Sequence, residues 1–390
     1  MDIDRQLEVI RRGAVEIISE DELRRKLEEG AKKIRPLTVK AGFDPTAPDI
    51  HLGHAVLLRK LRQFQELGHK VVFLIGDFTA CIGDPSGKSE KRRQLTREEV
   101  RLNAETYKKQ VGKILDLRRL RVVFNSAWFE RMSVRDILQL TARATASQMF
   151  ARADFRKRQA RGEDISLIEF MYPLLQGYDS AVLEADIELG VTDQIFNLLV
   201  GRDIQKDLGK PQQVVITMPL LEGTDGTQKM SKSSGNYIGI NETAQEMFGK
   251  LMSIPDALTP KYAELLTDLG PAELKALHPK EAKVKLAQDI IRQFHGAEAA
   301  DKASREFERI FARGEIPSEM PEFYTTGDKT VLQILSEGGL TKSGNESRRL
   351  IREGAVTFNG QRVDAENFIP RQSGVLKAGP RRYLKVIVQS

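Results

Sequence analysis

Cysteine is almost absent from this sequence, because Cys81 is the only one in 390 residues. A single thiol cannot form an internal disulfide, which excludes the disulfide-rich secreted classes and fits a reducing compartment. Long hydrophobic runs are also absent, since the longest, such as VVFLIG, fall far short of a membrane span. The stretch MDIDRQLEVIRRG at the N-terminus has acids where a secretory signal has an apolar core. We therefore expect a cytoplasmic protein.

The composition is that of an ordinary globular protein, with 40% apolar and 30% charged residues, and the length predicts two or three domains. The net charge of +6 is unevenly spread. Residues 331–390 contain ten basic and five acidic side chains, so this short terminal segment carries most of the excess. A local basic bias without an amphipathic lipid anchor favours a polyanionic partner such as RNA or DNA over a membrane.

Short apolar runs alternate with segments of helical periodicity over the first part of the chain, which predicts an α/β fold with a Rossmann-like parallel sheet in residues 1–240. A connective insertion is expected at about 100–190. Residues 241–325 lack strand patterns and predict an α-helical domain, with GEIPSEMPEFYTTGD as a linker. Residues 330–390 predict a small α+β domain with a turn at Asn359 and Gly360. The runs expected to form strands are LTVKAGF, HKVVFLIGDF, RVVFNSAWF and QQVVITMPLL.

Two of the five histidines, His51 and His54, lie three residues apart in DPTAPDIHLGHAVLLRKLRQF, where a loop becomes a helix. A helix N-terminus presents free N–H groups that attract anions, and Gly53 leaves room for a ligand ring against the backbone. The alternative is that these residues merely begin a helix. A zinc site is disfavoured because neither H-E-x-x-H nor C-x-x-C occurs, and we predict no protein-bound metal.

Two further polar loops need a role. The stretch GDPSGKS at residues 83–89 has only three residues between its glycines, one too few for a Walker phosphate loop, so we reject that class of ATPase. The stretch KMSKS at residues 229–233 follows a predicted strand and is too polar for a core. Alone it reads equally well as a solvated basic loop, but it lies one nucleotide-binding sheet downstream of the histidine pair.

Together, H-x-G-H and KMSKS resemble the signature of class I aminoacyl-tRNA synthetases, in which the two motifs hold ATP. Amino-acid activation develops charge on departing pyrophosphate, and lysine suits a mobile loop because it acts as a point charge. The resemblance implies ATP as a substrate, with Mg²⁺ carried by the ATP. It assigns catalytic roles to His51, His54, Lys229, Lys232 and Ser233, and ATP contacts also to Asp44, Thr46, Gly53, Asp193 and Gln194.

The segment YPLLQGYDSAVLEADIELGVTDQIFN resembles the amino-acid pocket of tyrosyl-tRNA synthetases. By this resemblance Asp84, Tyr172 and Gln176 hold the substrate ammonium, and Asp179 accepts a hydrogen bond from the phenol. Gln194 reaches the tyrosine carboxylate. A buried acceptor left unpaired by phenylalanine would exclude that amino acid. The alternative is that Asp179 is a surface carboxylate and Tyr172 a core residue.

Two positions depart from the family pattern. Lys40 stands where many members have a tyrosine that also contacts the phenol, so we place Lys40 in the tyrosine site and expect recognition to depend mainly on Asp179. Val191 stands where a glycine is common, which puts a branched side chain near the expected ribose.

The basic tail resembles the small RNA-binding domain of a small-subunit ribosomal protein, which implies binding of tyrosine tRNA through Arg348, Arg349, Arg352 and Arg362. A solvated face is the alternative. A second basic cluster could meet the acceptor arm or be solvated with equal reason. The resemblance also implies a homodimer and an α-helical domain on the anticodon side. The second cluster contains Arg152, Arg156, Lys157, Arg158 and Arg161.

Three other classes share part of this pattern. A tryptophanyl synthetase shares both motifs but is not expected to keep QGYD or this tail. A small-molecule nucleotidyltransferase such as pantothenate synthetase uses H-x-G-H without needing an RNA-binding tail. A non-enzymatic RNA-binding protein explains the tail and leaves the histidines and the KMSKS lysines without a role. The sequence therefore favours a tyrosyl-tRNA synthetase that forms tyrosyl-adenylate and transfers tyrosine to the 3′-terminal adenosine of its tRNA.

Overall fold

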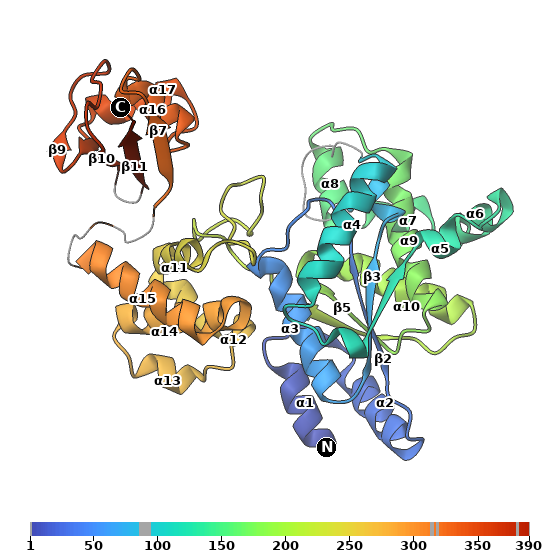
Figure 1. Cartoon of the computed structure of the whole chain (residues 1–390). Coiled ribbons are helices and arrows are strands. Elements are labelled where there is room, and N and C mark those ends of the chain that lie inside the picture. Colours follow the sequence, from blue (N-terminus) through green and yellow to red (C-terminus); the bar gives the residue numbers. More distant parts are fainter. Residues whose placement is uncertain (1, 86–94, 313–315, 317–319, 380–381, 390) are drawn as a thin grey trace. The chain divides into compact units, whose positions relative to one another are not determined.

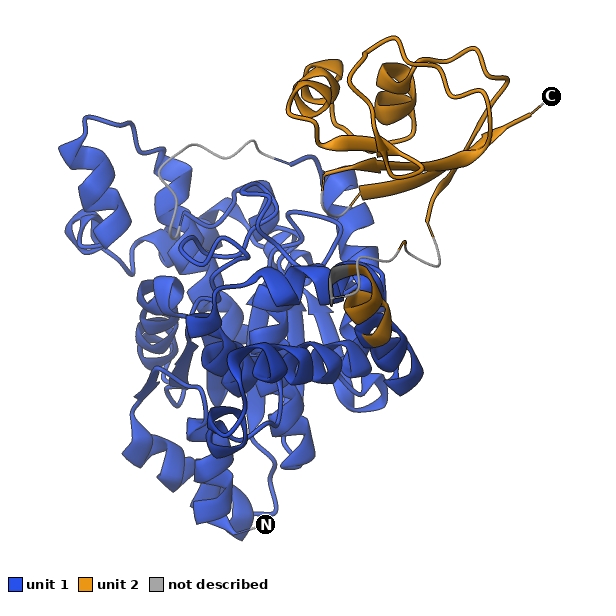
Figure 2. Ribbon diagram, turned by 90° about the vertical axis from the view of Figure 1, so that its left-hand side faces the viewer, with its two compact units in different colours: residues 1–304 blue, residues 305–390 orange. Residues whose placement is uncertain are grey.

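The computed structural model describes residues 2–85, 95–312, 316, 320–379 and 382–389 (Figure 1). The chain separates into two compact units, Met1–Ser304 and Arg305–Ser390 (Figure 2). In the described part of the chain, no helix is long and apolar enough to cross a membrane. The finer division into three domains stays a prediction.

The first unit is built on a six-stranded sheet in the order β1-β6-β5-β2-β3-β4. Neighbouring strands from β2 to β6 are parallel, as predicted, and their branched apolar side chains are buried on both faces. Strand β5 was not predicted, nor was the edge strand β1, which is antiparallel to β6 and only three residues long. The strands are β1 (Glu16–Ile18), β2 (Thr38–Phe43), β3 (Lys70–Ile75), β4 (Leu120–Phe124), β5 (Ile187–Val191) and β6 (Val214–Met218).

The strand order sets the place of the site. From β2 the chain moves outward to β3, and from β5 it moves outward in the other direction to β6. Right-handed crossovers therefore put helices α3 (Leu52–Glu66) and α10 (Ile195–Asp207) on opposite faces of the sheet, as Figure 1 shows. Ligands of such sheets bind in the crevice at the carboxyl ends of the strands where the direction reverses, here between β2 and β5.

The remaining helices of the sheet region surround this frame. The stretch 100–190, expected as an insertion, contributes β4 to the sheet itself, so the added helices lie between β4 and β5. They are α5 (Ser126–Phe129), α6 (Val134–Thr141), α7 (Ala146–Phe150), α8 (Ala153–Ala160) and α9 (Leu167–Val182), beside α1 (Ile3–Arg11), α2 (Glu20–Lys32) and α4 (Arg97–Val111).

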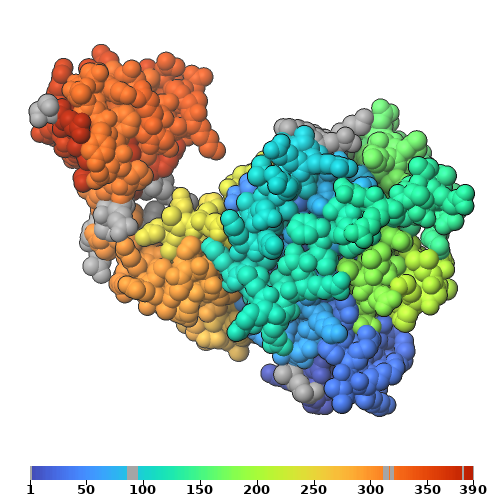
Figure 3. Space-filling view, turned by 45° about the vertical axis from the view of Figure 1, so that its right-hand side comes forward, coloured from blue at the N-terminus to red at the C-terminus, as the bar shows by residue number. Residues whose placement is uncertain are grey.

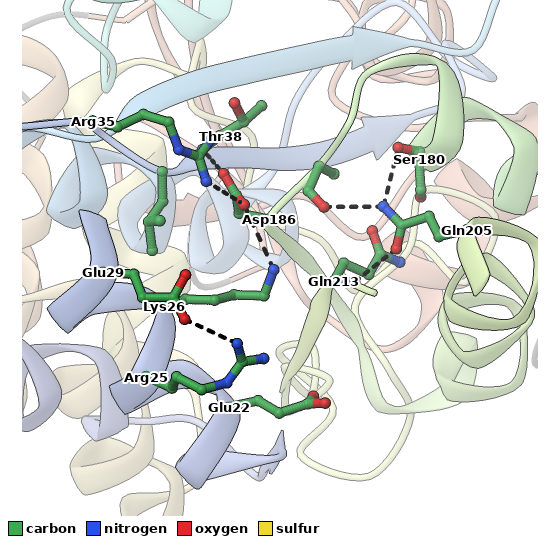
Figure 4. Close-up of polar contacts among 12 residues, drawn as sticks. Glu22, Arg25, Lys26, Glu29, Arg35, Thr38, Ser180, Asp186, Gln205 and Gln213 are labelled. Atoms are coloured by element: carbon green, nitrogen blue, oxygen red, sulfur yellow. Dashed lines mark hydrogen bonds and ion pairs between the residues drawn. The ribbon is translucent and has the colours of Figure 1, made fainter. Parts of the chain in front are cut away.

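A buried polar cluster joins β5 to the start of β2 (Figure 4). The Asp186 carboxylate accepts from the backbone N–H of Thr38 at 2.9 Å and from the Arg35 guanidinium at 2.9 Å. The Lys26 ammonium lies 3.6 Å from the same carboxylate, and both side chains are about 8% exposed. The cluster pins one end of the β2–β5 pair, at the edge remote from the carboxyl ends of the strands.

Residues 241–312 contain helices and no strand within the described range, whereas the predicted helical domain, 241–325, also includes Glu322–Thr325, which form a strand of the second unit. Thr243 caps the first of them through the N–H of Glu246, and Glu246 reaches back, which is the capping-box arrangement. The helices are α11 (Ala244–Ser253), α12 (Thr259–Leu266), α13 (Pro271–Lys275), α14 (Pro279–His295) and α15 (Ala297–Ala312).

The second unit packs two short helices on a five-stranded sheet of order β7-β11-β10-β8-β9. Asn359 and Gly360 have φ values of 49° and 81° between β8 and β9, which is the left-handed pair that a two-residue hairpin requires. The predicted linker was partly wrong, because its EFYT segment forms β7 and pairs in parallel with β11. The elements are β7 (Glu322–Thr325), α16 (Val331–Glu337), α17 (Gly344–Arg352), β8 (Val356–Phe358), β9 (Gln361–Arg362), β10 (Gly374–Ala378) and β11 (Arg382–Val388).

Candidate active site

A cavity of about 500 Å³ opens at the carboxyl ends of β2 and β5, where the topology places it. Its walls come from the loop after β2, the start of α3, the turn after β5 and the KMSKS loop (residues 229–233). Most residues that the sequence nominated for the small ligands line it, although they are spread over nearly 190 positions. They are Asp44, Thr46, His51, Gly53, His54, Asp84, Tyr172, Val191, Asp193, Gln194, Lys229, Lys232 and Ser233.

The two imidazoles stack at the N-terminus of α3, with ring centroids 3.9 Å apart and planes inclined by 30°. The backbone N–H of His51 donates to Nδ1 of His54 at 3.3 Å, so the ring proton of neutral His54 lies on Nε2. Burial, with help from Lys232, lowers the pKa of His54 to about 4. Burial, His54 and Lys232 lower the pKa of His51 to about 2. Both rings are therefore neutral donors and acceptors at neutral pH, and the positive charge of the cavity comes from the lysines.

Gly53 is needed for this stack. A Cβ atom at position 53 would lie 2.9 Å from Cε1 of His51, which is closer than carbon atoms approach without displacement. The Nδ1 atom of His51 is buried and has no hydrogen-bond partner among the described residues. A buried ring nitrogen of this kind, in a side chain that lines the cavity, is available to a ligand as a donor or an acceptor.

Each KMSKS lysine is held by a carboxylate across the cavity. Lys229 Nζ lies 3.2 Å from Asp193 Oδ2, and Lys232 Nζ lies 2.6 Å from Asp49 Oδ2. The ring of Tyr237 lies beneath the Lys232 ammonium at 5.6 Å. Asp49 and Tyr237 were not predicted from the sequence. The signal for Asp49 was its place two residues before His51, in the loop that already carried Asp44.

A second group of polar side chains lines the other part of the cavity. The Tyr172 hydroxyl donates to Asp44 Oδ2 at 2.8 Å, and the Thr79 hydroxyl donates to Asp44 Oδ1 at 2.8 Å. Asp84 accepts from Gln194 Nε2 at 3.0 Å. The cavity therefore has a carboxylate-rich end beside Asp84 and Tyr172 and a lysine-bearing end beside the KMSKS loop.

Asp179 lies on α9 two turns beyond Tyr172, is 2% exposed and does not line the cavity directly. Its carboxylate accepts from Trp128 Nε1 at 2.9 Å and from Asn125 Nδ2 at 3.3 Å. Burial raises the pKa of Asp179 to about 7, against the opposing effects of Lys40 and of these two donors. Asn125 and Trp128 were not predicted, although both follow β4 at the same edge of the sheet.

The Lys40 ammonium is engaged inside the protein by Glu188 and Ser180, which corrects its placement among the residues that bind tyrosine directly. Its side chain is fully buried, with Nζ 2.9 Å from Glu188 Oε1 and 2.8 Å from the Ser180 hydroxyl. The physical reason is that a lysine at this depth needs a carboxylate, and neighbouring β5 supplies one. Gln176 also lies outside the cavity lining, with its amide bonded to Glu188 and Asn197.

Arg152 is the second correction, because its side chain is only 3% exposed and cannot serve as a surface contact for RNA. It pairs with Asp154 at 2.9 Å and donates to Asn197 Oδ1 at 2.7 Å. Arg158 is buried as well, against Glu169, whereas Arg156 is exposed. Of the stretch 83–89, residues 86–89 lie outside the described part of the chain.

The four arginines nominated in the tail are exposed on the second unit. Arg348 lies 3.3 Å from Glu366 and Arg362 lies 2.5 Å from Asp364, both as exposed ion pairs. Such pairs contribute little and exchange easily for a polyanion. No cluster of three or more metal-ligating side chains occurs among the described residues.

Comparison with known proteins gives a consistent result. Residues 32–312 match the family model of class I tRNA synthetases (W and Y). The chain is 52% identical to a tyrosine–tRNA ligase of Carboxydothermus hydrogenoformans, covering 100% of this chain and 99% of that protein, and 53% identical to one of Geobacter metallireducens, covering 99% and 100%. The crystal structure of a tyrosyl-tRNA synthetase complexed with L-tyrosine from Archaeoglobus fulgidus is similar with a TM-score of 0.64 and 26% identity, over 78% of this chain and 100% of that one.

Proposed function

The chain belongs to the tyrosine–tRNA ligase family of class I aminoacyl-tRNA synthetases, and we propose that the cavity between β2 and β5 is where it binds ATP and tyrosine. Enzymes of this class activate an amino acid with ATP and then charge tRNA. The observation that carries the proposal is that His51, His54 and both KMSKS lysines face the same cavity as Asp84 and Tyr172.

In the activation step, the carboxylate of tyrosine attacks the α-phosphorus of ATP and pyrophosphate leaves. Lys229 and Lys232 stabilise the charge that grows on the departing pyrophosphate, exchanging Asp193 and Asp49 for phosphate oxygens. The neutral imidazole of His54 can donate from Nε2 without adding charge of its own. Ser233 lies on the same loop and offers a hydroxyl to the phosphates.

The nucleoside is assigned to the remaining walls of the cavity. Asp193 and Gln194 follow β5 beside Val191, where a ribose hydroxyl would find both a carboxylate and an amide. Gly53, in the first turn of α3, offers close backbone approach for the nucleotide. Thr46 lines the same cavity, and Asp44 supports the loop of Thr46 through its bonds to Tyr172 and Thr79. Mg²⁺ enters as part of the ATP substrate.

Tyrosine binds at the carboxylate-rich end. Asp84, Tyr172 and Gln176 hold its ammonium, and the phenol hydroxyl donates to Asp179, whose own donors Asn125 and Trp128 fix the carboxylate in place. Phenylalanine would leave this buried carboxylate with one partner fewer, which is the physical basis for its exclusion.

The exposed arginines of the second unit make the phosphate contacts with tyrosine tRNA, namely Arg348, Arg349, Arg352 and Arg362. Arg156 in the sheet unit remains a candidate for the acceptor arm. Their exposed guanidinium groups and the basic excess of the tail support this assignment. The single cysteine supports action in the cytoplasm.

The chain is also assigned a second copy of itself as a partner, on the basis of exposed apolar side chains of the first unit. Val134 and Leu138 on α6 are 78% and 63% exposed, and Leu167 at the start of α9 is 82% exposed. In Figure 3 the stretch from about 95 to 150, cyan to green, covers much of the visible face of this unit. Large apolar side chains at such exposure support a homodimer through α6 and the start of α9.

The deciding experiment is exchange of labelled pyrophosphate into ATP, run with the full-length chain and each of the twenty amino acids in turn. Tyrosine alone should support exchange. Exchange with tryptophan, which the matched family model also covers, or with no amino acid, would contradict the assignment of tyrosine to this cavity.

A further inference from the structure

The two corrected residues, Lys40 and Arg152, lie at opposite ends of one buried chain of hydrogen bonds. The Arg152 guanidinium donates to Asn197 Oδ1 at 2.7 Å, and Asn197 Nδ2 donates to Gln176 Oε1 at 2.9 Å. Gln176 Nε2 then donates to Glu188 Oε1 at 3.3 Å. Lys40 closes the chain with its 2.9 Å ion pair to the same carboxylate oxygen. The five residues come from five elements of the first unit. Arg152 caps the N-terminus of α8, and the others lie in α10, α9, β5 and β2, in the order of the chain of bonds.

The charged ends leave only one orientation for the two amides between them. A guanidinium has donors and no acceptor, and an ionised carboxylate has acceptors and no donor. If Asn197 turned over, its NH₂ would face the Arg152 donors. If Gln176 turned over, its carbonyl oxygen would face Glu188 and its NH₂ would face that of Asn197. The chain therefore directs every donor from Arg152 towards Glu188.

Lys40 is the charged partner of the Glu188 carboxylate, which accepts from Gln176. Glu188 is 1% exposed, and a carboxylate at that depth needs a cation beside it, which Lys40 supplies at 2.9 Å. The other oxygen of Glu188 accepts from the Ser180 hydroxyl at 2.8 Å and from the amide of Gln213. Gln205 holds both of these supports, bonding the carbonyl of Ser180 and the N–H of Gln213 (Figure 4).

The fixed amides lie beside the carboxylate-rich end of the cavity. Asn197 Nδ2 is 3.5 Å from Asp84 Oδ1, and Gln194 donates to the other oxygen of Asp84. The carbonyl oxygen of Gln176 accepts from the same Asn197 Nδ2 atom that lies 3.5 Å from Asp84 Oδ1, so a neutral acceptor and a carboxylate share one neighbour. A carboxylate with an added acceptor is the chemistry that binds an ammonium group.

We propose that Lys40 with Glu188, and Arg152 at the far end, are positioning residues that set the orientation of Gln176 and Asn197 for the ammonium group of the amino-acid substrate. This inference rests on the proposed function of the cavity. It gives Lys40 a role at the ammonium, while the phenol acceptor Asp179 is held by donors of its own, Asn125 and Trp128. Lys40 acts on Asp179 only through its charge, which the charge of Glu188 opposes, and the double variant removes both charges together.

The test compares three ligands by calorimetric titration in the absence of ATP: L-tyrosine, tyramine, which keeps the ammonium, and 3-(4-hydroxyphenyl)propionate, which lacks it. The variant is the double substitution Lys40→Met with Glu188→Gln. This variant removes both buried charges together, and it leaves a neutral side chain at position 188 that no longer demands a donor from Gln176.

We expect L-tyrosine and tyramine to bind about 10-fold more weakly or worse, because a hydrogen bond to a charged group is lost. Binding of 3-(4-hydroxyphenyl)propionate should stay within about 2-fold of the wild type, which is a small free-energy change. Equal weakening of all three ligands, or no weakening, would overturn the proposal, because a merely structural ion pair does not distinguish them.

The matched control is Lys26→Met, which removes another buried, ion-paired lysine at the remote end of the same two strands and touches no cavity residue. All three ligands should bind it as they bind the wild type. If the double variant does not fold, as thermal unfolding would show, Asn197→Ser takes its place and should give the same ligand pattern. A wild-type chain that binds none of the three ligands would instead contradict the proposed function itself.

Discussion

At the scale of single residues, the cavity shows how neighbours decide what a carboxylate does. Asp49 and Asp193 face lysines and hold them as ion pairs. Asp179 is buried away from solvent, so its pKa lies at about 7, in spite of the nearby Lys40. An aspartate therefore forms an ion pair with lysine at positions 49 and 193, and acts as a buried hydrogen-bond acceptor with a raised pKa at position 179.

The raised pKa of Asp179 predicts pH-dependent selection of tyrosine. Above pH 7 the carboxylate is ionised and accepts strongly from the phenol, whereas below pH 7 it takes up a proton and accepts weakly. The ratio of kcat/KM for tyrosine to kcat/KM for phenylalanine should therefore rise between roughly pH 6 and pH 8, on either side of that pKa of about 7. Taking the ratio cancels effects on ATP and on the shared ammonium group.

The groups facing Asp179 are the donors Asn125 and Trp128 and the nearby charges of Lys40 and Glu188. Because Asp179 is raised above its unfolded pKa, its native form holds more protons between about pH 4 and pH 7, and its contribution to stability falls as pH rises. A selectivity ratio that stays constant across that pKa would show that phenol recognition lies elsewhere.

Removing the charge of Asp49 is predicted to strengthen ATP binding. Its pair with Lys232 must be given up or shared when the ATP phosphates arrive, and its own charge repels them. Asp49→Asn should tighten ATP binding by up to about 5-fold, since both side chains are partly exposed and such pairs are worth no more than about 1 kcal/mol. Equilibrium binding of ATP measures this directly.

A double-mutant cycle provides the control for Asp49. Lys232→Ala should lower the rate of adenylate formation by a larger factor than it lowers the affinity for ATP. In the Lys232→Ala background, Asp49→Asn should lose that part of its effect that depends on the ion pair. Weaker ATP binding in Asp49→Asn alone would mean that the carboxylate positions Lys232 for the phosphates and does not compete with them.

At the scale of elements, α3 joins fold and chemistry most closely. Its apolar face, with Leu52, Val56 and Leu61 among others, packs in the core. Its N-terminus carries the stacked imidazoles into the cavity, where the N–H of Leu52 donates to the carbonyl of Ile238 and ties the first turn to the segment after the KMSKS loop. Substitutions in the first turn of α3 can therefore change the site without disturbing the packing of the rest of the helix.

Gly53→Ala is predicted to damage the site while sparing the fold. Alanine favours a helix over glycine by about 1 kcal/mol, so thermal stability should be kept or raised. The added Cβ would meet the His51 ring at 2.9 Å and displace the stack. We expect kcat/KM for ATP in pyrophosphate exchange to fall by about 10-fold or more, by analogy with the loss of one positioned donor.

Gly249→Ala is the matched control, because Gly249 lies inside α11 and a Cβ there has nothing within 4 Å. It should be as stable as Gly53→Ala or more so, with full activity. Unchanged ATP kinetics in Gly53→Ala would show that the stacked geometry of the imidazoles is not required.

At the scale of the whole molecule, the basic excess is concentrated in the last sixty residues of the second unit. Residues 331–390 carry ten basic and five acidic side chains, and the cavity belongs entirely to the first unit. Because β7 pairs with β11, the second unit begins before Glu322, earlier than the sequence suggested. Adenylate chemistry and RNA binding should therefore separate at a cut before β7.

A chain ending at Met320 should keep tyrosine-dependent pyrophosphate exchange and lose most of its tRNA charging. Its RNA binding should also depend less on salt, with a slope smaller by roughly 0.7 to 0.9 log units for each phosphate that the protein no longer neutralises. Filter binding at several salt concentrations measures the slope. The salt slope of a full-length chain carrying Arg348→Ala and Arg352→Ala should lie between the slopes of the wild type and the truncated chain. If the truncated chain charges tRNA at the full rate, the tail is not the RNA-binding unit.

The sequence by itself determined the parallel sheet, the helix that begins after His51, and the two motifs that meet at the cavity, because periodicity, caps and motif spacing are local signals. It did not determine β1, β5 or β7, whose short runs become strands only beside their partners. It placed Lys40 in the tyrosine site and Arg152 among the RNA contacts, because the buried partner of a lysine or an arginine is not visible in the sequence.

Only the tertiary structure brought Glu188 to Lys40 and Asn197 to Arg152, over 148 and 45 positions of sequence. Such a partner is chosen by strand order and helix packing, so no local pattern reveals it. The same holds for Asp49 and Lys232, whose pairing depends on a loop folding back across the sheet. Local sequence patterns thus identified residues that can take part in the chemistry. Long-range packing decided which of these residues face each other, and a buried charge needs such a partner.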